Sequence, residues 1–179
     1  MFHRSERLLL RPAWPEDWRA VHAALGDEGV VRNLARAPWP YAEEDARDFC
    51  ARDVPQRTPR FLITLAATGE VVGAVGYGPS DQEDDIELGY WIARKHWGHG
   101  YATEAAQAVI EVAQMAGQRR MSAGHFVDNP ASGKVLRKVG FMPTGKVALR
   151  HSLGRGGEAP CVLYRLDLDV DPCLTDKAA

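Results

Sequence analysis

Cysteine is scarce in this sequence of 179 residues, and its distribution gives no sign of a metal or disulfide framework. Cys50, Cys161 and Cys173 are odd in number and far apart. They form neither a Cys-x-x-Cys pair nor a Cys/His cluster with metal-ligand spacing. We therefore expect no bound metal, and a reducing cytoplasm is the location that this cysteine usage fits best.

Long apolar runs and an excess of basic charge are missing as well. No stretch reaches the apolar length of a signal-peptide core or a membrane span, so we expect neither export nor membrane attachment. The formal net charge of -2 provides no positive field for a phosphate backbone, which argues against nucleic acid as a partner. With 45% hydrophobic and 26% charged residues the composition is that of an ordinary globular chain. We expect one domain over residues 1–168 and a frayed tail over 169–179.

The hydrophobic periodicity changes along the chain and predicts an α/β protein. Helical spacing, capping residues and stop signals predict helices at 15–25, 30–35, 42–54, 101–117 and 130–139. Short β-rich or alternating runs predict strands at 7–11, 61–65, 71–75, 86–92, 121–127, from 141 onward and at 159–168. The acidic stretch 81–85 is most simply a solvated loop, and a cation site is the weaker interpretation.

A turn with two glycines, Trp97-Gly98-His99-Gly100, separates the strand at 86–92 from the longest predicted helix. Glycines before a helix leave backbone N–H groups uncovered, and the helix N-terminus carries about half a positive charge, so the turn suits a phosphate. The alternative is a turn whose glycines supply only backbone freedom. A Walker loop is excluded because Gly-Lys-Ser/Thr is absent, and a dinucleotide fingerprint is excluded because Thr103 replaces its third glycine.

Several motifs together resemble one family. They are Arg7-Leu8-Leu9-Leu10-Arg11-Pro12, Glu87-Leu88-Gly89-Tyr90-Trp91-Ile92, Trp97 through Ala105, and Asn129-x-x-Ser132 through Gly140-Phe141. In these motifs the chain resembles the GCN5-related N-acetyltransferases (GNAT), specifically the branch of the RimJ and RimL ribosomal-protein N-acetyltransferases, over residues from about 5 to 168. The resemblance implies an α/β GNAT fold, in which a mixed, splayed sheet of six or seven strands is flanked by helices on both faces.

The resemblance also implies acetyl-CoA as the acetyl donor. The family's pyrophosphate site corresponds to the turn and first helical residues, although Lys95 departs mildly from the family's usual Gln or Arg. In the family the pantetheine arm lies between two splayed parallel strands, which would be 86–93 and 121–127 here. The implied cofactor contacts are the backbone at Ile92, Ala93 and Arg94, the side chain of Asn129, and the residues Trp97, Gly98, His99, Gly100, Tyr101, Ala102 and Thr103.

The implied reaction is direct attack of a neutral amine on the thioester, which requires a base and a proton for the leaving thiolate. Glu87 is our candidate base, directly or through water, and an ordinary strand carboxylate is its alternative role. The resemblance places Ser132 beside the sulfur, where its hydroxyl could donate to the thiolate. Many relatives use a tyrosine four residues later, but that position is Leu136 here. His125 ranks behind Glu87 as a proton acceptor, because a satisfied strand histidine is the commoner case.

The acceptor is not encoded in a motif. Trp39 and Tyr41, held between prolines, are our candidates for an acceptor wall, although most aromatic rings are core residues. A protein N-terminal amine is one candidate acceptor, and a small amine such as an antibiotic, polyamine or amino acid is the alternative. A non-catalytic sensor that binds acyl-CoA is a third interpretation. A homodimer through the C-terminal strands is compatible with the sequence.

Overall fold

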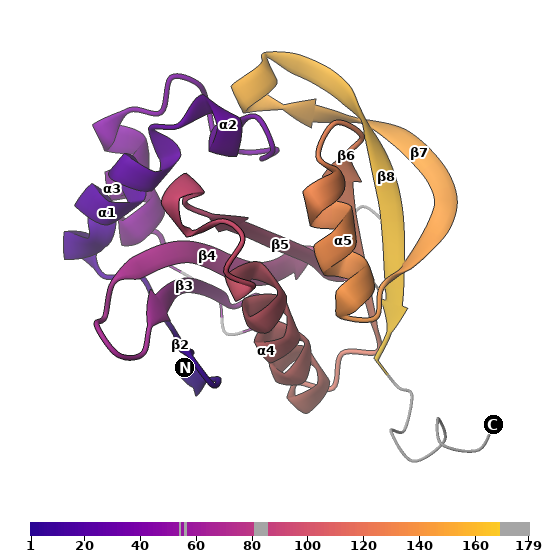
Figure 1. Cartoon of the computed structure of the whole chain (residues 1–179), viewed down its shortest axis with the longest axis horizontal. Coiled ribbons are helices and arrows are strands. Elements are labelled where there is room, and N and C mark those ends of the chain that lie inside the picture. Colours follow the sequence, from indigo (N-terminus) through magenta and orange to yellow (C-terminus); the bar gives the residue numbers. More distant parts are fainter. Residues whose placement is uncertain (54, 56, 81–85, 169–179) are drawn as a thin grey trace.

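The computed structural model describes residues 1–53, 55, 57–80 and 86–168 of the chain (Figure 1). The predicted acidic loop at 81–85 and the predicted frayed tail at 169–179 lie outside the described residues. Among the described residues, no helix is both long and apolar enough to cross a membrane.

The described strands are β1 His3–Arg4, β2 Leu8–Arg11, β3 Arg60–Leu65, β4 Val71–Pro79, β5 Ile86–Ile92, β6 Arg120–Phe126, β7 Met142–Ser152 and β8 Gly157–Asp167. These eight strands form one sheet in the order β1-β2-β3-β4-β5-β6-β8-β7. Within it β5 and β6 run parallel, whereas the other neighbours are antiparallel. The predicted mixed sheet is confirmed. The count exceeds six or seven because β1, an edge strand of two residues, is too short to give a sequence pattern.

The described α-helices are α1 Trp18–Leu25, α2 Glu28–Val31, α3 Glu43–Ala51, α4 Tyr101–Met115 and α5 Pro130–Lys138. Short 3-10 turns occupy Pro15–Asp17, Arg94–His96 and Leu153–Arg155. Each predicted helix is present. The largest difference in length is at α3, and α2 begins and ends earlier than the predicted helix at 30–35. α2 is a single turn of four residues.

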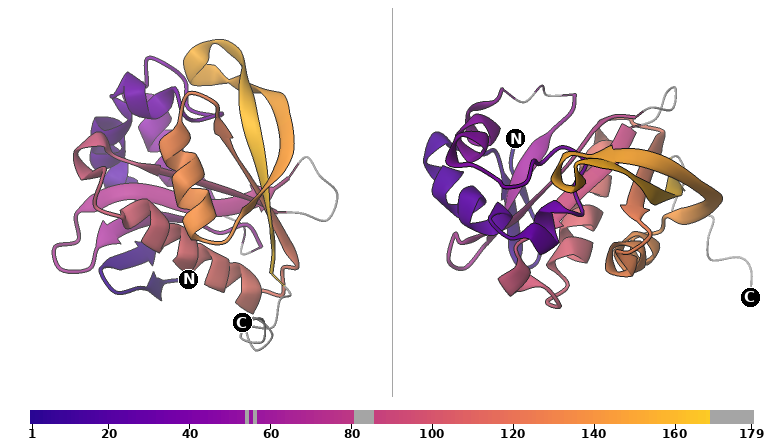
Figure 2. Two further views of the ribbon diagram at one scale, coloured as in Figure 1. Left: turned by 45° about the vertical axis from the view of Figure 1, so that its right-hand side comes forward. Right: turned by 90° about the horizontal axis from the view of Figure 1, so that it is seen from above.

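Alternation along β5 sorts its side chains between the two faces of the sheet. Ile86, Leu88 and Ile92 are buried in a core cluster together with residues of α4 and α5. Trp91 is buried in a second cluster, with residues of α1, α2 and α3. Helices therefore cover both faces, as predicted. α4 and α5 lie in front of the strands in Figure 1, and Figure 2 shows the same layers from two other sides.

The sheet opens between β5 and β6. These two strands pair only at their first residues, where Ile86 faces Met121 and Glu87 faces Ser122. β6 then pairs with β8 along its whole length, from Arg120 to Phe126. From Leu88 onward, β5 therefore has no strand pairing with β6, and this leaves a gap between the two strands in the middle of the sheet.

β7 forms the other edge of the sheet and is exposed along most of its length. Several apolar side chains on it face solvent, namely Met142, Val147 and Leu149, which are 70%, 60% and 65% exposed. Edge strands with exposed apolar residues are available for pairing with another chain. The homodimer through the C-terminal strands stays a prediction.

A buried ion pair connects the end of β2 to the start of the helical segment. Arg11 Nη1 lies 2.7 Å from Asp17 Oδ2, and Arg11 Nη2 lies 2.8 Å from Asp17 Oδ1. The two side chains are only 9% and 10% exposed, and the Trp14 N–H also donates to Asp17. Burial alone would raise the pKa of Asp17, but the hydrogen bonds from Arg11 and Trp14 outweigh it and lower that pKa below 3.8.

We expect Asp17→Asn to lower the free energy of unfolding by about 3 kcal/mol, because it leaves the Arg11 guanidinium buried without its counter-charge. The folded-state pKa of Asp17 is depressed, so this contribution is present at neutral pH and is lost as the pH falls through 3.8 and below. Urea unfolding of both proteins at several pH values measures it. Asp48→Asn on the exposed side of α3 is the control. A difference between Asp17→Asn and the parent protein that does not shrink in acid would contradict this role.

Candidate functional site

The open edge of β5 carries backbone groups that point into the gap. The Ala93 N–H donates to the Val72 carbonyl of β4 at 2.9 Å, so the groups of Ala93 face β4. Because directions alternate along an antiparallel strand, the N–H and C=O groups of Leu88, Tyr90 and Ile92 face the gap. The Ile92 carbonyl accepts a hydrogen bond from the Trp97 indole at 2.7 Å. The gap therefore offers a ladder of backbone groups to an extended ligand.

The glycine turn follows directly at the end of this ladder. Gly98 and Gly100 both have a φ of 80°, a left-handed conformation that glycine adopts without steric cost. Gly100 is the N-cap of α4 and offers no side chain to the first helical N–H groups. These N–H groups have no partner within the helix and lie at its positive end. The turn and the helix start therefore form a cradle of N–H groups suited to phosphate oxygens.

Two residues outside the turn, Arg7 and Glu104, hold it in place, and sequence reasoning missed this role for both. Arg7 donates from Nη1 to the His99 carbonyl at 3.0 Å and from Nε to Glu104 at 2.8 Å. Glu104 also accepts from Ser5 Oγ and from the Arg7 N–H, both at 2.7 Å. Burial would raise the pKa of Glu104, but these hydrogen bonds outweigh it and lower that pKa. The carboxylate thus ties the β1–β2 hairpin to the first turn of α4.

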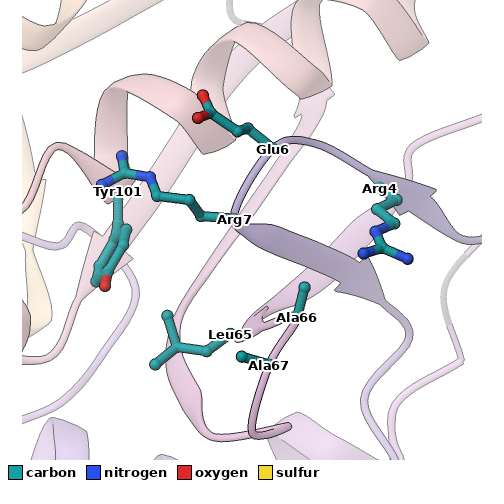
Figure 3. A pocket seen from close by; sticks show the side chains of 7 residues that line it. All are labelled: Arg4, Glu6, Arg7, Leu65, Ala66, Ala67 and Tyr101. Carbon is teal, nitrogen blue, oxygen red and sulfur yellow. The ribbon is translucent and has the colours of Figure 1, made fainter.

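The outer side of the turn borders a cavity of about 400 Å³. Its walls are Arg4, Glu6, Arg7, Leu65, Ala66, Ala67 and Tyr101, shown in Figure 3. The Arg7 guanidinium lies over the Tyr101 ring at 4.9 Å, and the His99 ring stacks on Tyr101 with centroids 5.5 Å apart. None of these lining residues belongs to β5 or β6, so this cavity is separate from the gap in the sheet.

The N-terminus of α5 brings two hydroxyl groups together beside the gap. Asn129 caps α5, since its side-chain oxygen accepts from the Ser132 N–H at 3.4 Å, and Pro130 occupies the first helical position. Ser132 Oγ lies 2.7 Å from the hydroxyl of Tyr90 on β5. Sequence reasoning predicted Asn129 and Ser132 as site residues but missed Tyr90. The alternation of β5 was the available signal, because it places Tyr90 on the face that α5 covers.

Glu87 lies on the opposite face of β5 and is held by a basic residue. Its carboxylate accepts a hydrogen bond from Arg150 on β7, and the two side chains are 25% and 23% exposed. This partner could not be predicted from the sequence, because 63 residues separate the pair. A carboxylate oriented by a guanidinium, next to the point where the gap begins, can accept a hydrogen bond from a cation or an amine.

His125 is packed beneath α5. Its Nε2 lies 3.5 Å from the Tyr164 hydroxyl, which accepts a hydrogen bond from Arg137 at 2.8 Å. Its ring fills the space that Gly133 leaves, since a Cβ on Gly133 would come within 2.5 Å of Nε2. The register of β5 and β6 places His125 and Glu87 on opposite faces of the sheet. The two candidate bases are therefore not brought together, and the catalytic role of His125 stays a prediction.

The segment around α2 bridges the two sides of the gap through ion pairs. At its start, Asp27 caps α2 and pairs with Arg94, whose Nη2 lies 2.9 Å from Oδ1. At its end, Arg32 and Arg155 both bind Asp128, the residue before Asn129, at 3.1 and 2.7 Å. The Arg94 and Arg155 guanidinium groups lower the pKa values of Asp27 and Asp128, respectively. Ion pairs thus connect the segment 27–32 to Arg94, which precedes the glycine turn, and to Asp128, which precedes α5.

The two predicted acceptor-wall residues differ in burial. Trp39 is 38% exposed, whereas Tyr41 is only 7% exposed and lies in the core cluster of α1, α2 and α3. Burial raises the pKa of Tyr41 to about 12. Trp39 is therefore the more exposed of the two rings, and the role of both residues as an acceptor wall stays a prediction.

Among the described residues, no three His, Cys, Asp or Glu side chains gather closely enough to hold a metal ion. His96, one of the two histidines of the turn region, lies 3.2 Å from Glu70, which also pairs with Lys95 at 2.6 Å. His99 lies 2.9 Å from the Trp97 carbonyl through Nδ1. The two histidines therefore have separate partners.

Comparisons with known proteins agree with this geometry. The model of the acetyltransferase (GNAT) domain matches residues 7–142. The uncharacterized N-acetyltransferase YoaA of Bacillus subtilis is 30% identical over 146 residues, which are 79% of this chain and 82% of that protein. The ribosomal-protein-serine acetyltransferase of Escherichia coli is 30% identical over 114 residues, which are 60% of this chain and 64% of that protein.

The fold is shared with a solved structure of the same family. The crystal structure of a GNAT-family acetyltransferase from Bacillus anthracis is 27% identical, covers 94% of this chain and 99% of its own, and has a TM-score of 0.81. The predicted GNAT fold is therefore confirmed. The chain belongs to the acetyltransferase (GNAT) domain family, and the protein is an N-acetyltransferase enzyme.

Proposed function

We propose that the protein transfers the acetyl group of acetyl-CoA to a primary amine by direct attack of the amine on the thioester. One observation carries this proposal: the open edge of β5 runs directly into the N–H cradle at the start of α4. A ligand with an extended amide-containing arm and a phosphate group at its end would match both features. Coenzyme A has these two parts in this order, and the family resemblance implies it.

The donor would lie along β5 with its phosphates on the turn. The N–H groups around Gly98, Gly100 and the first residues of α4 would bind the pyrophosphate, and the Thr103 hydroxyl could add one more donor. The pantetheine amides would pair with the gap-facing groups of Tyr90 and Ile92, in the manner of an added strand. The Trp97 indole already occupies the Ile92 carbonyl and so ties the turn to the strand.

The chemistry would proceed between the two walls of the gap. The amine nitrogen attacks the thioester carbonyl carbon, and Glu87 accepts the amine proton directly or through water. The bond between carbon and sulfur then breaks, and its electron pair stays on the sulfur of the leaving thiolate. Ser132, at the N-terminus of α5, donates a hydrogen bond to that sulfur, and the positive end of the helix favours the negative charge.

For the acceptor we propose a protein N-terminal amine, which is the acceptor class that the resemblance to the RimJ and RimL enzymes implies. The local similarity to the ribosomal-protein-serine acetyltransferase supports this proposal. A small amine such as a polyamine, an amino acid or an antibiotic is the alternative acceptor, because no motif in the sequence encodes the acceptor. A non-catalytic sensor would bind acetyl-CoA but transfer nothing.

Gly100→Val is expected to weaken acetyl-CoA binding by more than about tenfold, since a β-branched residue is strained at a φ of 80° and its Cβ would lie 3.5 Å from Nη2 of Arg7, which holds the turn. Isothermal titration calorimetry with acetyl-CoA measures this change. The matched control is Gly145→Val on β7, which has a φ of 76° and open space around it. Unchanged affinity in Gly100→Val, with the fold intact by circular dichroism, would refute the phosphate assignment.

Glu87→Gln is expected to lower kcat by about 100-fold or more while the affinity for acetyl-CoA changes little, because the loss of a general base acts on the transition state. Steady-state kinetics and calorimetry measure the two quantities. Glu43→Gln, which removes the exposed partner of Arg47 on α3, is the control. Full turnover in Glu87→Gln would remove this carboxylate from the mechanism.

A panel of acceptors is expected to separate the acceptor classes. Short peptides with free N-termini and small amines are offered with acetyl-CoA, and released coenzyme A thiol and acetylated product are measured by mass spectrometry. We expect peptide acetylation at the α-amine. Acetylation of small amines alone would support the alternative acceptor, and binding of acetyl-CoA without transfer to any amine would support the sensor.

A further inference from the structure

Ser132 has a hydrogen-bond partner, Tyr90, that has no part in the proposed acetyl transfer. The Tyr90 hydroxyl lies 2.7 Å from Ser132 Oγ and 3.3 Å from the Ser132 carbonyl oxygen. Tyr90 comes from β5 and Ser132 from the first turn of α5, so the contact links β5 to the helix that follows β6. Leu136, where many relatives carry a tyrosine, is 1% exposed and belongs to the core cluster.

Each of the two hydroxyls has one hydrogen to donate, which allows two arrangements. In one, Ser132 donates to Tyr90, and Tyr90 donates to the Ser132 carbonyl. In the other, Tyr90 donates to Ser132 Oγ, and the Ser132 hydrogen is free to point elsewhere. A thiolate beside Ser132 selects the second arrangement, because hydrogen bonds to a charged acceptor are the stronger ones and successive hydrogen bonds polarise one another.

We propose that Tyr90 is a positioning residue for acetyl transfer, which donates its hydrogen bond to Ser132 Oγ and so directs the Ser132 hydrogen at the sulfur of coenzyme A. This inference rests on the proposed function, because the place of the sulfur beside Ser132 comes from it. No proton leaves Tyr90. As the carbon–sulfur bond breaks, the electron pair stays on the sulfur, and the Ser132 O–H, polarised by Tyr90, stabilises the charge.

The environment of Tyr90 keeps its hydroxyl group protonated, so that the hydroxyl remains a hydrogen-bond donor. Its ring packs against the core cluster formed with α4 and α5. Burial raises the pKa of Tyr90 to about 12, so the phenol keeps its hydrogen at neutral and moderately alkaline pH. The hydroxyl is also held at a fixed distance from Ser132 by two regular elements, which pre-organises the pair before the donor binds.

The test uses the complex of the full chain with coenzyme A, so it needs no acceptor. The pKa of the bound thiol is measured by the ultraviolet absorbance of the thiolate in the parent protein, Tyr90→Phe, Ser132→Ala and the double variant. Tyr77→Phe is the matched control, since Tyr77 is a buried tyrosine of the neighbouring strand β4. We expect Tyr90→Phe and Ser132→Ala each to raise the thiol pKa, the double variant to add little, and Tyr77→Phe to change nothing.

Turnover with an amine gives the second readout. We expect Tyr90→Phe to lower kcat about 3- to 10-fold with an unchanged KM for acetyl-CoA, because the variant weakens the hydrogen bond that Ser132 donates to the sulfur in the transition state. If Ser132→Ala shifts the thiol pKa and Tyr90→Phe does not, or if the two effects simply add, the role of Tyr90 is overturned while the proposed function stands. If Ser132→Ala leaves the thiol pKa unchanged, the sulfur does not lie beside Ser132, and the proposed donor site and the role of Tyr90 fail together.

Discussion

The structure depends on the loss of hydrogen bonding between β5 and β6. The two strands pair at only two positions, whereas β6 pairs along its whole length with β8 on its other edge. An unpaired strand edge inside a protein is costly unless something satisfies its N–H and C=O groups. The gap therefore suits a ligand whose own N–H and C=O groups can pair with β5 as an added strand would. The glycine turn at its end adds a preference for phosphate, and together they describe a ligand of the coenzyme A type.

Ion pairs and hydrogen bonds from distant parts of the chain give the gap its shape. Arg7 and Glu104 hold the turn, and Arg150 holds Glu87. Asp27 pairs with Arg94 and Asp128 pairs with Arg32, which connects the segment 27–32 to both sides of the gap. The exposed pairs contribute little stability on their own, and their main effect is on geometry. The hydrogen bond between Tyr90 and Ser132 adds one more such contact, because it links β5 to the helix that follows β6.

Much of this arrangement could be predicted from the sequence where the signal is local. The alanine stripe of α4, the cap at Asn129 and the left-handed glycines at 98 and 100 each follow from residues within a few positions of one another. The partners of Glu87, Glu104 and Ser132 could not be predicted in this way, since they depend on which strands become neighbours. β1 is too short for a periodic pattern, and the burial of Tyr41 depends on the packing of α1 and α3 around it.

We propose that the open edge of β5 and the start of α4 bind one donor molecule together. Hydrogen–deuterium exchange with and without saturating acetyl-CoA tests this proposal, because it reports on backbone amides in both places at once. We expect slower exchange in peptides covering 88–92 and 98–103, with little change in β2 and β3. Unchanged exchange in both peptides, or protection confined to the cavity wall at Ala66 and Ala67, would contradict it.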